Sequence, residues 1–412
     1  MTTTASGPAR TSPADAPPRR IGESFRLFRQ RIRDGDLGST PVVAGLIVIW
    51  IVFQILNPTF LTAPNLVNLA LQSAAVGTIS IGVVLVLLMG QIDLSVGSIS
   101  GFASAILAVT FVQQNWPVAV SIMAALGAGA LFGALYGILY TRFGVPSFVI
   151  TLAGLLGVLG LQLRVLGDAG SINIPFDSWI VQFAQQMFLP DLVSYLAAAL
   201  ATGAYFSVTW RSQRRRSAAG LGSMHVAETV MRSLALLAVL GFGSWYLNKD
   251  RGIGLMFVLF VVLVVCTNYV LQRTKWGRAI YAVGGNVEAA RRAGIRVNRV
   301  YISVFVAGAT FAALGGALAA ARLAAANQNS GGGDTNLTAI AAAVIGGTSL
   351  FGGRGSAWSA LLGIVVIMSI SSGLTLLSLD SSVRYMVTGV VLLLAVIIDA
   401  ISRRSRASNG IA

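Results

Sequence analysis

Residues Arg273–Val300 have the sequence RTKWGRAIYAVGGNVEAARRAGIRVNRV and separate two long apolar runs, near 253–271 and 301–321. An apolar run of about 20 residues crosses the roughly 30 Å hydrocarbon core of a bilayer as one helix. In proteins built from such helices, Lys and Arg collect in the loops on the cytoplasmic side. The stretch therefore predicts two membrane-spanning helices joined by a basic cytoplasmic loop, 273–300.

The composition of the whole chain indicates the same fold class. Of its 412 residues, 55% are hydrophobic and only 10% are charged, whereas soluble domains carry about 25% charged residues. The mean hydropathy is +0.78. Strands of a membrane barrel would be shorter and would alternate polar with apolar residues, and the apolar runs here do not alternate. We therefore predict an all-α, polytopic integral membrane protein.

Similar apolar runs recur along residues 41–402, which we assign to one transmembrane domain. We predict a helical bundle of about 12 spans (roughly 10 to 14 by length) with both termini in the cytoplasm. Segment 336–350 is short and rich in Gly, Ala and Thr, so it fits a half-helix or re-entrant segment, which protein or water must shield from lipid. A broken helix would also fit residues 66–101. The expected spans lie near 41–59, 66–89, 97–114, 117–140, 145–166, 191–210, 229–247, 253–271, 301–321, 336–350, 357–376 and 382–400.

The distribution of positive charge sets the orientation of these spans. The chain has 29 Lys and Arg against 14 Asp and Glu, a net charge of +15, which in a soluble protein would suggest nucleic acid as a partner. Here all but five of the basic residues fall on the cytoplasmic side, as the positive-inside rule requires. Membrane lipid is therefore an expected partner, and nucleic acid is not. The five exceptions are Arg164, Lys249, Arg251, Arg322 and Arg384.

Both ends of the chain are expected to be cytoplasmic tails. Residues 1–40 are basic and initially rich in Thr, Ser and Pro, and from Ile21 apolar residues recur at helical spacing. That pattern fits an amphipathic helix on the membrane surface, and a solvated basic tail fits it equally well. Residues 403–412 form the second tail.

Few side chains suit catalysis or metal binding. Cys266 is the only cysteine and His225 the only histidine, so we expect no metal site and no disulfide within the chain. Cys266 lies in an apolar span and is expected to be a small core residue. The pair Gly284-Gly285 has neither the preceding strand nor the following Gly-Lys-Ser/Thr of a phosphate-binding loop. We expect no catalytic residue, no bound cofactor and no ATP hydrolysis by this chain.

Within the basic loop, the segment Glu288–Gly294 has the pattern of a short helix ended by glycine. Gly294 can end the helix in a left-handed conformation, Ala289 and Ala290 permit close approach, and Glu288 can pair with a basic group. Another protein could grip such a segment. An ordinary solvated loop helix also fits the same spacing.

Several stretches together resemble a known family. In order along the chain, they resemble the membrane permease subunits of bacterial ABC importers for monosaccharides, of the ribose, xylose and galactose type. The extra spans expected between about 185 and 260 make the chain most similar to the longer, xylose-type members. The stretches are Gln91–Ser98 (QIDLSVGS), Val145–Leu152 (VPSFVITL), Gly277–Asn286 (GRAIYAVGGN), Glu288–Ile295 (EAARRAGI) and Ile340–Gly355 (IAAAVIGGTSLFGGRG).

This resemblance implies a function and a set of partners. The chain would be the permease subunit of an ATP-driven importer for xylose or a related pentose or hexose, in the bacterial cytoplasmic (inner) membrane. A cytosolic ABC ATPase would bind the ATP, a periplasmic or extracellular protein would deliver the sugar, and a second, identical permease subunit would complete the pore. Glu288, Ala289, Ala290 and Gly294 would couple the permease to the ATPase.

Polar residues near span ends are candidates for a translocation path. Asp93 is the only acidic residue between 40 and 160, and an ionisable group at a span boundary is a functional candidate by default. Its carboxylate could also cap the next span by accepting from free backbone N–H groups, and the two roles are compatible. The hydroxyl groups could contact sugar or bond their own helix backbone. The candidates are Gln91, Asp93, Ser95, Ser98, Ser147, Thr151, Thr348 and Ser349.

A proton-coupled secondary sugar transporter is the alternative function, with Asp93 as the proton carrier. Such carriers usually need more than one ionisable group within the membrane, and those groups are scarce in this chain.

Overall fold

A computed structural model describes residues 40–219, 226–380 and scattered positions between 382 and 397. The chain divides into two compact units. Among the described residues, unit 1 comprises 189–219 and 226–252, and unit 2 comprises 40–188, 253–380 and the scattered positions beyond. The expected tails (apart from Thr40), the expected surface helix and most of the span expected at 382–400 lie outside the described residues.

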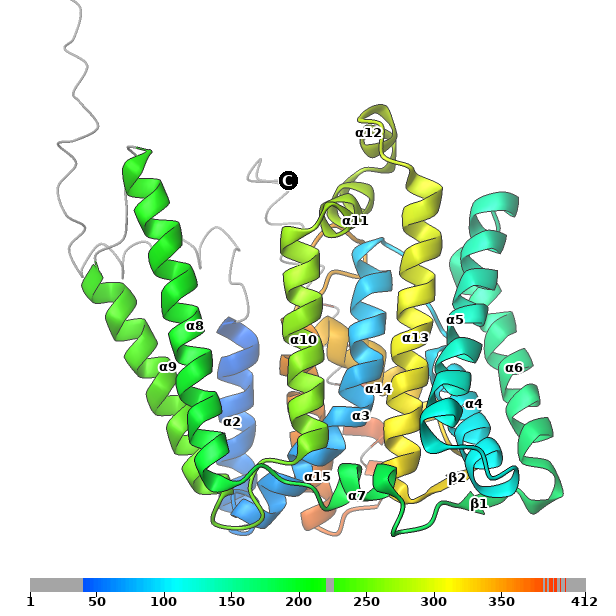
Figure 1. Cartoon of the computed structure of the whole chain (residues 1–412), viewed down its shortest axis with the longest axis horizontal. Helices are drawn as coiled ribbons and strands as arrows, with labels where there is room; N and C mark the ends of the chain where they lie inside the picture. Colours follow the sequence, from blue (N-terminus) through cyan, green and yellow to red (C-terminus); the bar gives the residue numbers. More distant parts are fainter. Residues whose placement is uncertain are drawn as a thin grey trace, which may run out of the picture. The chain divides into compact units, whose positions relative to one another are not determined.

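The described part of the chain is predominantly helical, as the sequence predicts. Within it, nine helices are long and apolar enough to cross a bilayer, which confirms an all-α, multi-pass membrane protein. Unit 2 contains most of them (Figure 1). Its helices are α2 (Thr40–Leu56), α3 (Ala63–Leu88), α4 (Val96–Ala108, continued by a π-helical turn, Val109–Gln113), α5 (Val118–Phe143), α6 (Ser147–Leu166), α7 (Trp179–Gln185), α10 (Leu255–Arg273), α11 (Lys275–Gly285), α12 (Val287–Arg292), α13 (Val297–Leu323), α14 (Gly333–Ile345) and α15 (Trp358–Leu376).

Helices α3 and α13 form the centre of unit 2. Helix α3 is apolar on all sides and almost wholly buried, because α10, α13, α14 and α15 pack around it; an all-round apolar helix is suited to such a position. Helix α5 turns Gly129, Gly133 and Gly137 toward α13, where an added Cβ would overlap atoms of α13. These three glycines, spaced at i, i+4 and i+8, let the two backbones approach closely. The resulting van der Waals packing holds the helices together in lipid, where no hydrophobic driving force acts between them.

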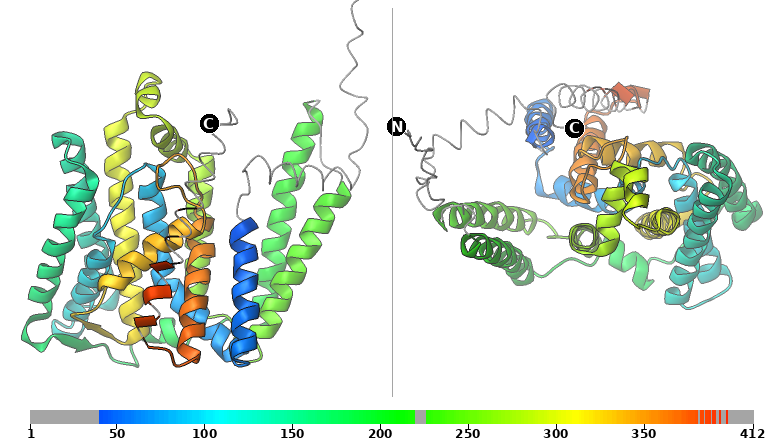
Figure 2. Two further views of the ribbon diagram at one scale, coloured as in Figure 1. Left: turned by 180° about the vertical axis from the view of Figure 1, so that it is seen from behind. Right: turned by 90° about the horizontal axis from the view of Figure 1, so that it is seen from above.

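Helix α2 packs on α15 (Figure 2). Phe53 of α2 shares a buried cluster with Ile370 and Leu374 of α15. The indole N–H of Trp50 donates to the hydroxyl oxygen of Ser369 at 2.9 Å. A helix at the start of the domain is thereby joined to one near its end.

Residues 66–101 and 336–350, for which the sequence fits a broken helix and a half-helix, depart from regular spans. Helix α3 ends at Leu88 and α4 begins only at Val96, so residues 89–95 form a non-helical segment, called here the 89–95 link. Helix α14 has 13 residues, about 20 Å at 1.5 Å per residue, which is too short to cross a bilayer. The side-chain amide of Asn336 in α14 donates to the carbonyl oxygen of Leu94 at 2.7 Å. The half-helix therefore satisfies backbone of the link that lipid could not satisfy.

A small antiparallel sheet joins the ends of α6 and α13. Strand β1 (Ser171–Asn173) pairs with β2 (Ala325–Asn327), with Ile172 opposite Ala326. The buried side chain of Gln162 fixes the same region by donating to the carbonyl oxygens of Asn327 at 3.0 Å and Ser330 at 2.9 Å. The sequence did not predict these strands, because three residues are too few to show alternation.

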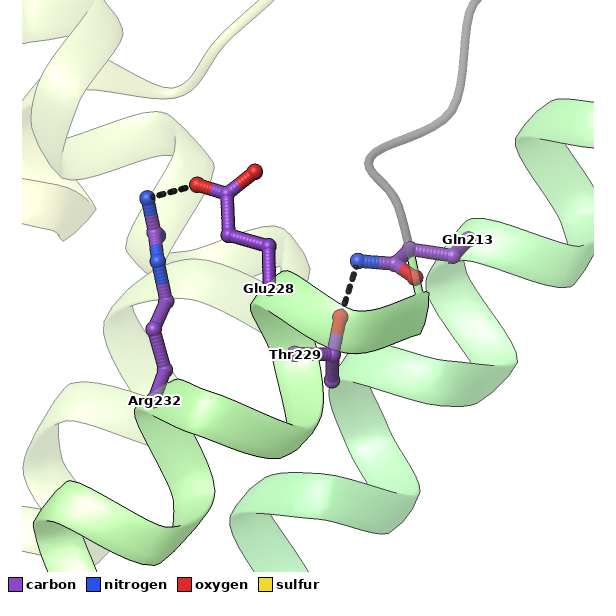
Figure 3. Close-up of polar contacts among 4 residues, drawn as sticks. All are labelled: Gln213, Glu228, Thr229 and Arg232. Carbon is purple, nitrogen blue, oxygen red and sulfur yellow. Dashed lines mark hydrogen bonds and ion pairs between the residues drawn. The ribbon is translucent and has the colours of Figure 1, made fainter. Parts of the chain in front are cut away.

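Unit 1, in its described part, is an antiparallel hairpin of α8 (Asp191–Ala218) and α9 (Val226–Leu247). Gln213 of α8 donates to the hydroxyl oxygen of Thr229 in α9 at 2.7 Å (Figure 3). At the other end, Asn248 donates to the hydroxyl of Ser194 at 2.9 Å. Helix α8 continues past the span expected near 191–210, and its last turns carry Arg211, Arg214, Arg215 and Arg216, where cations favour the negative end of the helix dipole.

Cys266 is exposed on α10, so its expected place in the core was wrong. Lipid and protein interior are equally apolar, and an apolar sequence alone does not show which of the two a side chain contacts.

Candidate functional site

Helix α12 is a single, doubly capped turn. The side chain of Asn286 accepts from the backbone N–H of Ala289 at 2.9 Å at its start. At its end Gly294 has φ +79°, and the N–H of Ile295 reaches back to the carbonyl oxygen of Ala290 at 3.1 Å. This is the left-handed glycine cap expected from the sequence. The caps explain how only six residues hold a defined helix.

The side chains of α12 divide between inward and outward faces. Ala290 is buried, while Ala289 is exposed. The Glu288 side chain is 64% exposed and pairs with Arg291 of the same helix at 3.1 Å. An exposed pair of this kind contributes little to stability. The carboxylate is therefore free to exchange its partner for a basic group of another protein at small cost.

Helix α11 connects α12 to the bundle, and both lie at the upper end of unit 2 in Figure 1. Helix α11 lies within the predicted loop 273–300, and Gly277, Ile280 and Val283 give it one buried face. The indole N–H of Trp276 donates to the hydroxyl of Ser303 in α13 at 2.8 Å. The hydroxyl of Tyr281 donates to the carbonyl oxygen of Gly355 at 2.8 Å.

Backbone contacts bring α11, α3 and the turn before α15 together. Gly284 packs so closely on the carbonyl oxygen of Leu88 that a Cβ at this position would overlap it. The same oxygen accepts from the backbone N–H of Gly353 at 2.9 Å. Leu88 is the last residue of α3, so this junction touches the start of the 89–95 link.

Asp93 is buried within that link and bonds its own chain. Its Oδ1 accepts from the backbone N–H of Ser95 at 2.8 Å and from the Ser95 hydroxyl at 2.6 Å. Its Oδ2 is also buried and has no hydrogen-bond partner among the described residues. The sequence left two roles open for Asp93. The bonds to Ser95 stabilise the turn that leads into α4, and Oδ2 remains available to accept a hydrogen bond from another group.

Ser147 and Thr151 lie beside the same link and hold it. Both are buried on α6. The Thr151 hydroxyl accepts from the N–H of Leu94 at 3.1 Å and donates to the carbonyl oxygen of Ser147 at 3.0 Å. The Ser147 hydroxyl oxygen lies 3.4 Å from the N–H of Ile92. The Thr151 hydroxyl therefore bonds backbone of both its own helix and the link, and the Ser147 hydroxyl bonds backbone of the link.

The predicted path residues form one group and a separate pair. Thr348 and Ser349 are buried in the turn that follows α14, where Ser349 accepts from the N–H of Phe351 at 3.3 Å. The described contacts of this turn with the link run through Gly90 and not through the two hydroxyl groups. Gln91, Asp93 and Ser95 belong to the link, Ser147 and Thr151 bond it from α6, and Ser98 is buried in the first turn of α4.

Three tyrosines complete this region and were missed in the sequence. The hydroxyl of Tyr136 in α5 approaches Ser95 and Asp93 without completing a hydrogen bond. The rings of Tyr140 and Tyr301 have centroids 4.7 Å apart, and the Tyr301 hydroxyl lies beside Gln91. Each tyrosine sits inside a long apolar span, where only the three-dimensional packing distinguishes it from a core residue.

A cleft of about 410 Å³ opens between the 89–95 link and the turn joining α5 to α6. Gln91, Tyr140, Ser147 and Phe148 are among the residues that line it. Gln91 and Ser147, two of the predicted path residues, therefore face this space. Asp93 is buried and is not among the lining residues.

Comparison with known proteins identifies related sequences over most of the chain. Residues 65–396 match the model of a family described as branched-chain amino acid transport system / permease component. The chain is 36% identical to the xylose transport system permease protein of Escherichia coli K12, over 88% of this chain and 92% of that protein. It is 32% identical to the ribose import permease protein of Bacillus subtilis, over 92% and 98%, and 32% identical to the fructose import permease protein of Rhizobium meliloti, over 88% and 86%. No solved structure matches the chain.

Proposed function

Since this chain belongs to the family of branched-chain amino acid transport system permease components, we propose that it is the permease subunit of an ATP-driven importer for xylose or a related monosaccharide. It is a transport subunit and not an enzyme. The relatives support a sugar as the substrate: although the family description names amino acids, the relatives found over nearly the full chain are named for xylose, ribose and fructose. Identity is higher to the xylose permease than to the other two, which favours a pentose.

The observation that carries the coupling part of the proposal is the arrangement of α11 and α12. Helix α12 presents the exposed Glu288, while α11 is held against the end of α3 by Gly284. A partner that grips α12 would therefore displace α11 and, through Leu88, the 89–95 link. Because the link holds Asp93 and contacts α6, a small movement there would reshape the polar path. Glu288 and Ala289 are the proposed contact residues, while Ala290 packs on the inward face of α12 and Gly294 ends the helix.

We propose that the partner at α12 is a cytosolic ABC ATPase, which binds and hydrolyses the ATP. A periplasmic or extracellular sugar-binding protein delivers the sugar at the opposite face. Two identical copies of this chain form the pore in the bacterial cytoplasmic membrane. The path residues are Gln91, Asp93, Ser95, Ser98, Ser147 and Thr151, with Thr348 and Ser349 in the adjoining turn.

The test is uptake of radiolabelled xylose by a bacterium without its own xylose transport, expressing the chain with its companion ATPase and binding protein. Uptake should stop when ATP is depleted and continue when the proton gradient is collapsed, and excess leucine should not compete. Vesicles containing the chain alone that concentrate xylose on a proton gradient would instead establish the proton-coupled alternative. Competition by leucine with no xylose uptake would overturn the sugar assignment.

A further inference from the structure

The cleft beside the 89–95 link combines aromatic and polar walls. Tyr140 and Phe148 contribute rings, Gln91 an amide and Ser147 a hydroxyl group. Its volume of about 410 Å³ falls within the range of roughly 300–1,000 Å³ typical of small-molecule sites. It is large enough for one monosaccharide and is open to the surface.

These side chains match the chemistry of a sugar ring. The C–H faces of a pyranose stack on aromatic rings, while its hydroxyl groups both donate and accept. The Gln91 amide offers two donors and an acceptor, and the Ser147 hydroxyl offers both functions. Neither acidic nor basic side chains line the cleft, so a neutral ligand fits it better than an ion or a zwitterionic amino acid.

The wall of the cleft is connected to α12. Tyr140 packs on Tyr301 with ring centroids 4.7 Å apart. Tyr301 lies beside Gln91 and belongs to α13, which contacts α12. Two lining side chains therefore contact one tyrosine on a helix that packs against α12.

We infer that this cleft is a monosaccharide-binding station at the end of the bundle that carries α12, the last position a sugar occupies before it leaves the pore. The inference rests on the proposed function and adds to it a place and a set of contacts. Displacement of α12 moves Tyr301, and Tyr301 moves Tyr140 and Gln91. The station then releases its sugar in step with the partner that grips α12.

Cysteine labelling tests the station independently of transport. Cys266, exposed on α10, is first replaced by Ala to give a thiol-free chain. Phe148→Cys then places a thiol in the cleft, and Val149→Cys places one next to it, outside the lining. The two parent side chains have similar exposures of 52% and 42%, so Val149→Cys is a matched control. Ser147→Cys is a second cleft variant that replaces a small side chain by another of similar size.

The rate of labelling by a membrane-impermeant maleimide is measured in inside-out vesicles holding the assembled transporter. Xylose should slow labelling of Phe148→Cys and Ser147→Cys hyperbolically, by about tenfold at ten times its dissociation constant by mass action. Labelling of Val149→Cys should not change, and leucine should protect neither position. Equal labelling rates with and without xylose at both cleft positions would overturn the station. It would also be overturned if added lipid slowed labelling at these positions and xylose did not.

Uptake of xylose by the same variants separates the two proposals. Uptake without protection refutes the station and leaves the proposed function intact. The absence of xylose uptake by the thiol-free chain, with normal membrane insertion, refutes the proposed function and the station with it.

Discussion

Gly353 donates its backbone N–H to the carbonyl oxygen of Leu88 at 2.9 Å, and this bond ties the turn before α15 to the last residue of α3. Gly284 of α11 packs against the same oxygen. Three segments far apart in the sequence thus meet at one backbone atom. That atom belongs to the residue before the 89–95 link, and Gly284 belongs to the helix that leads into the exposed α12, so the junction connects α12 with the link.

Gly284→Ala should weaken this junction, because the new methyl group would overlap the Leu88 oxygen. Overpacking of a tight site costs about 1–3 kcal/mol, so we expect a lower melting temperature and a loss of xylose uptake. Uptake per folded transporter, measured after quantifying protein in the membrane, checks the prediction.

Gly285→Ala is the matched control, since a Cβ at Gly285 meets no atom within 4 Å. It should leave uptake and melting temperature near those of the parent chain. If both variants behave alike, the contact between Gly284 and Leu88 does not transmit the movement of α11.

Local features of this region could be predicted from the sequence, and its long-range contacts could not. The glycine cap at Gly294 depends on the few residues around it, so the pattern of α12 was visible in the loop. Helix α11 was missed, although its spacing of Ile280 and Val283 is helical, because it lies within a basic stretch assigned as a loop. The contact of Gly284 with Leu88 joins distant segments by backbone atoms, for which no side-chain pattern exists.

Among the polar residues around Asp93, local features could again be predicted from the sequence and long-range contacts could not. Asp93 stood out because acidic residues in apolar surroundings are costly. Tyr136 did not, since a tyrosine in an apolar span usually packs as a core or interface residue. The short α14 was suggested by the Gly, Ala and Thr residues of 336–350, and a broken helix was considered for 66–101. The bond from Asn336 to Leu94 that joins them became evident only in three dimensions.

Glu288→Lys should abolish xylose uptake while leaving membrane insertion intact. The side chain is exposed, and its pair with Arg291 is of a kind that contributes about 0.2–1 kcal/mol, so the fold should tolerate the change. The charge reversal would instead repel a basic group on the ATPase. Uptake and co-purification with the ATPase should both fall at least tenfold, the factor that corresponds to about 1.4 kcal/mol of lost contact energy.

Glu228→Lys provides the same change of charge at another ion pair within one helix, in which Arg232 is exposed and Glu228 half-buried. Glu228 bonds Arg232 within α9 at 2.6 Å (Figure 3), in unit 1 and outside the 273–300 loop. This variant should retain uptake. Equal losses in the two variants would point to a general effect of surface charge and remove the specific role of Glu288.

Asp93→Asn should retain ATP-driven uptake. The Asn oxygen can accept both bonds that Ser95 now gives to Oδ1, and a neutral amide is less costly to bury than a carboxylate for which no ion pair exists among the described residues. Asp93→Ala removes the acceptor and leaves the Ser95 N–H unsatisfied, at a cost of about 1–3 kcal/mol. Thermal unfolding in detergent should therefore rank Asn above Ala.

The same pair of variants separates the two transport mechanisms. A proton carrier must titrate, so Asp93→Asn would stop a proton-coupled transporter completely, even where it folds well. Uptake assayed with an imposed pH gradient and without ATP provides the comparison. A fully folded Asp93→Asn chain with no uptake would count against the structural role argued for this carboxylate.

Thr151→Val should destabilise the 89–95 link although valine keeps the shape of threonine. The lost hydroxyl accepts from the N–H of Leu94 at 3.1 Å within a fully buried site. An unsatisfied buried backbone N–H costs about 1–3 kcal/mol, and lipid offers no water to replace the partner.

Thr151→Ser retains the hydroxyl and removes only a methyl group, so it should preserve most of the uptake that valine loses. The comparison isolates the hydrogen bond from the packing, because the valine variant conserves volume and the serine variant conserves chemistry. If serine and valine reduce xylose uptake equally, the methyl group supports the link, and the hydroxyl serves only the helix to which it also donates.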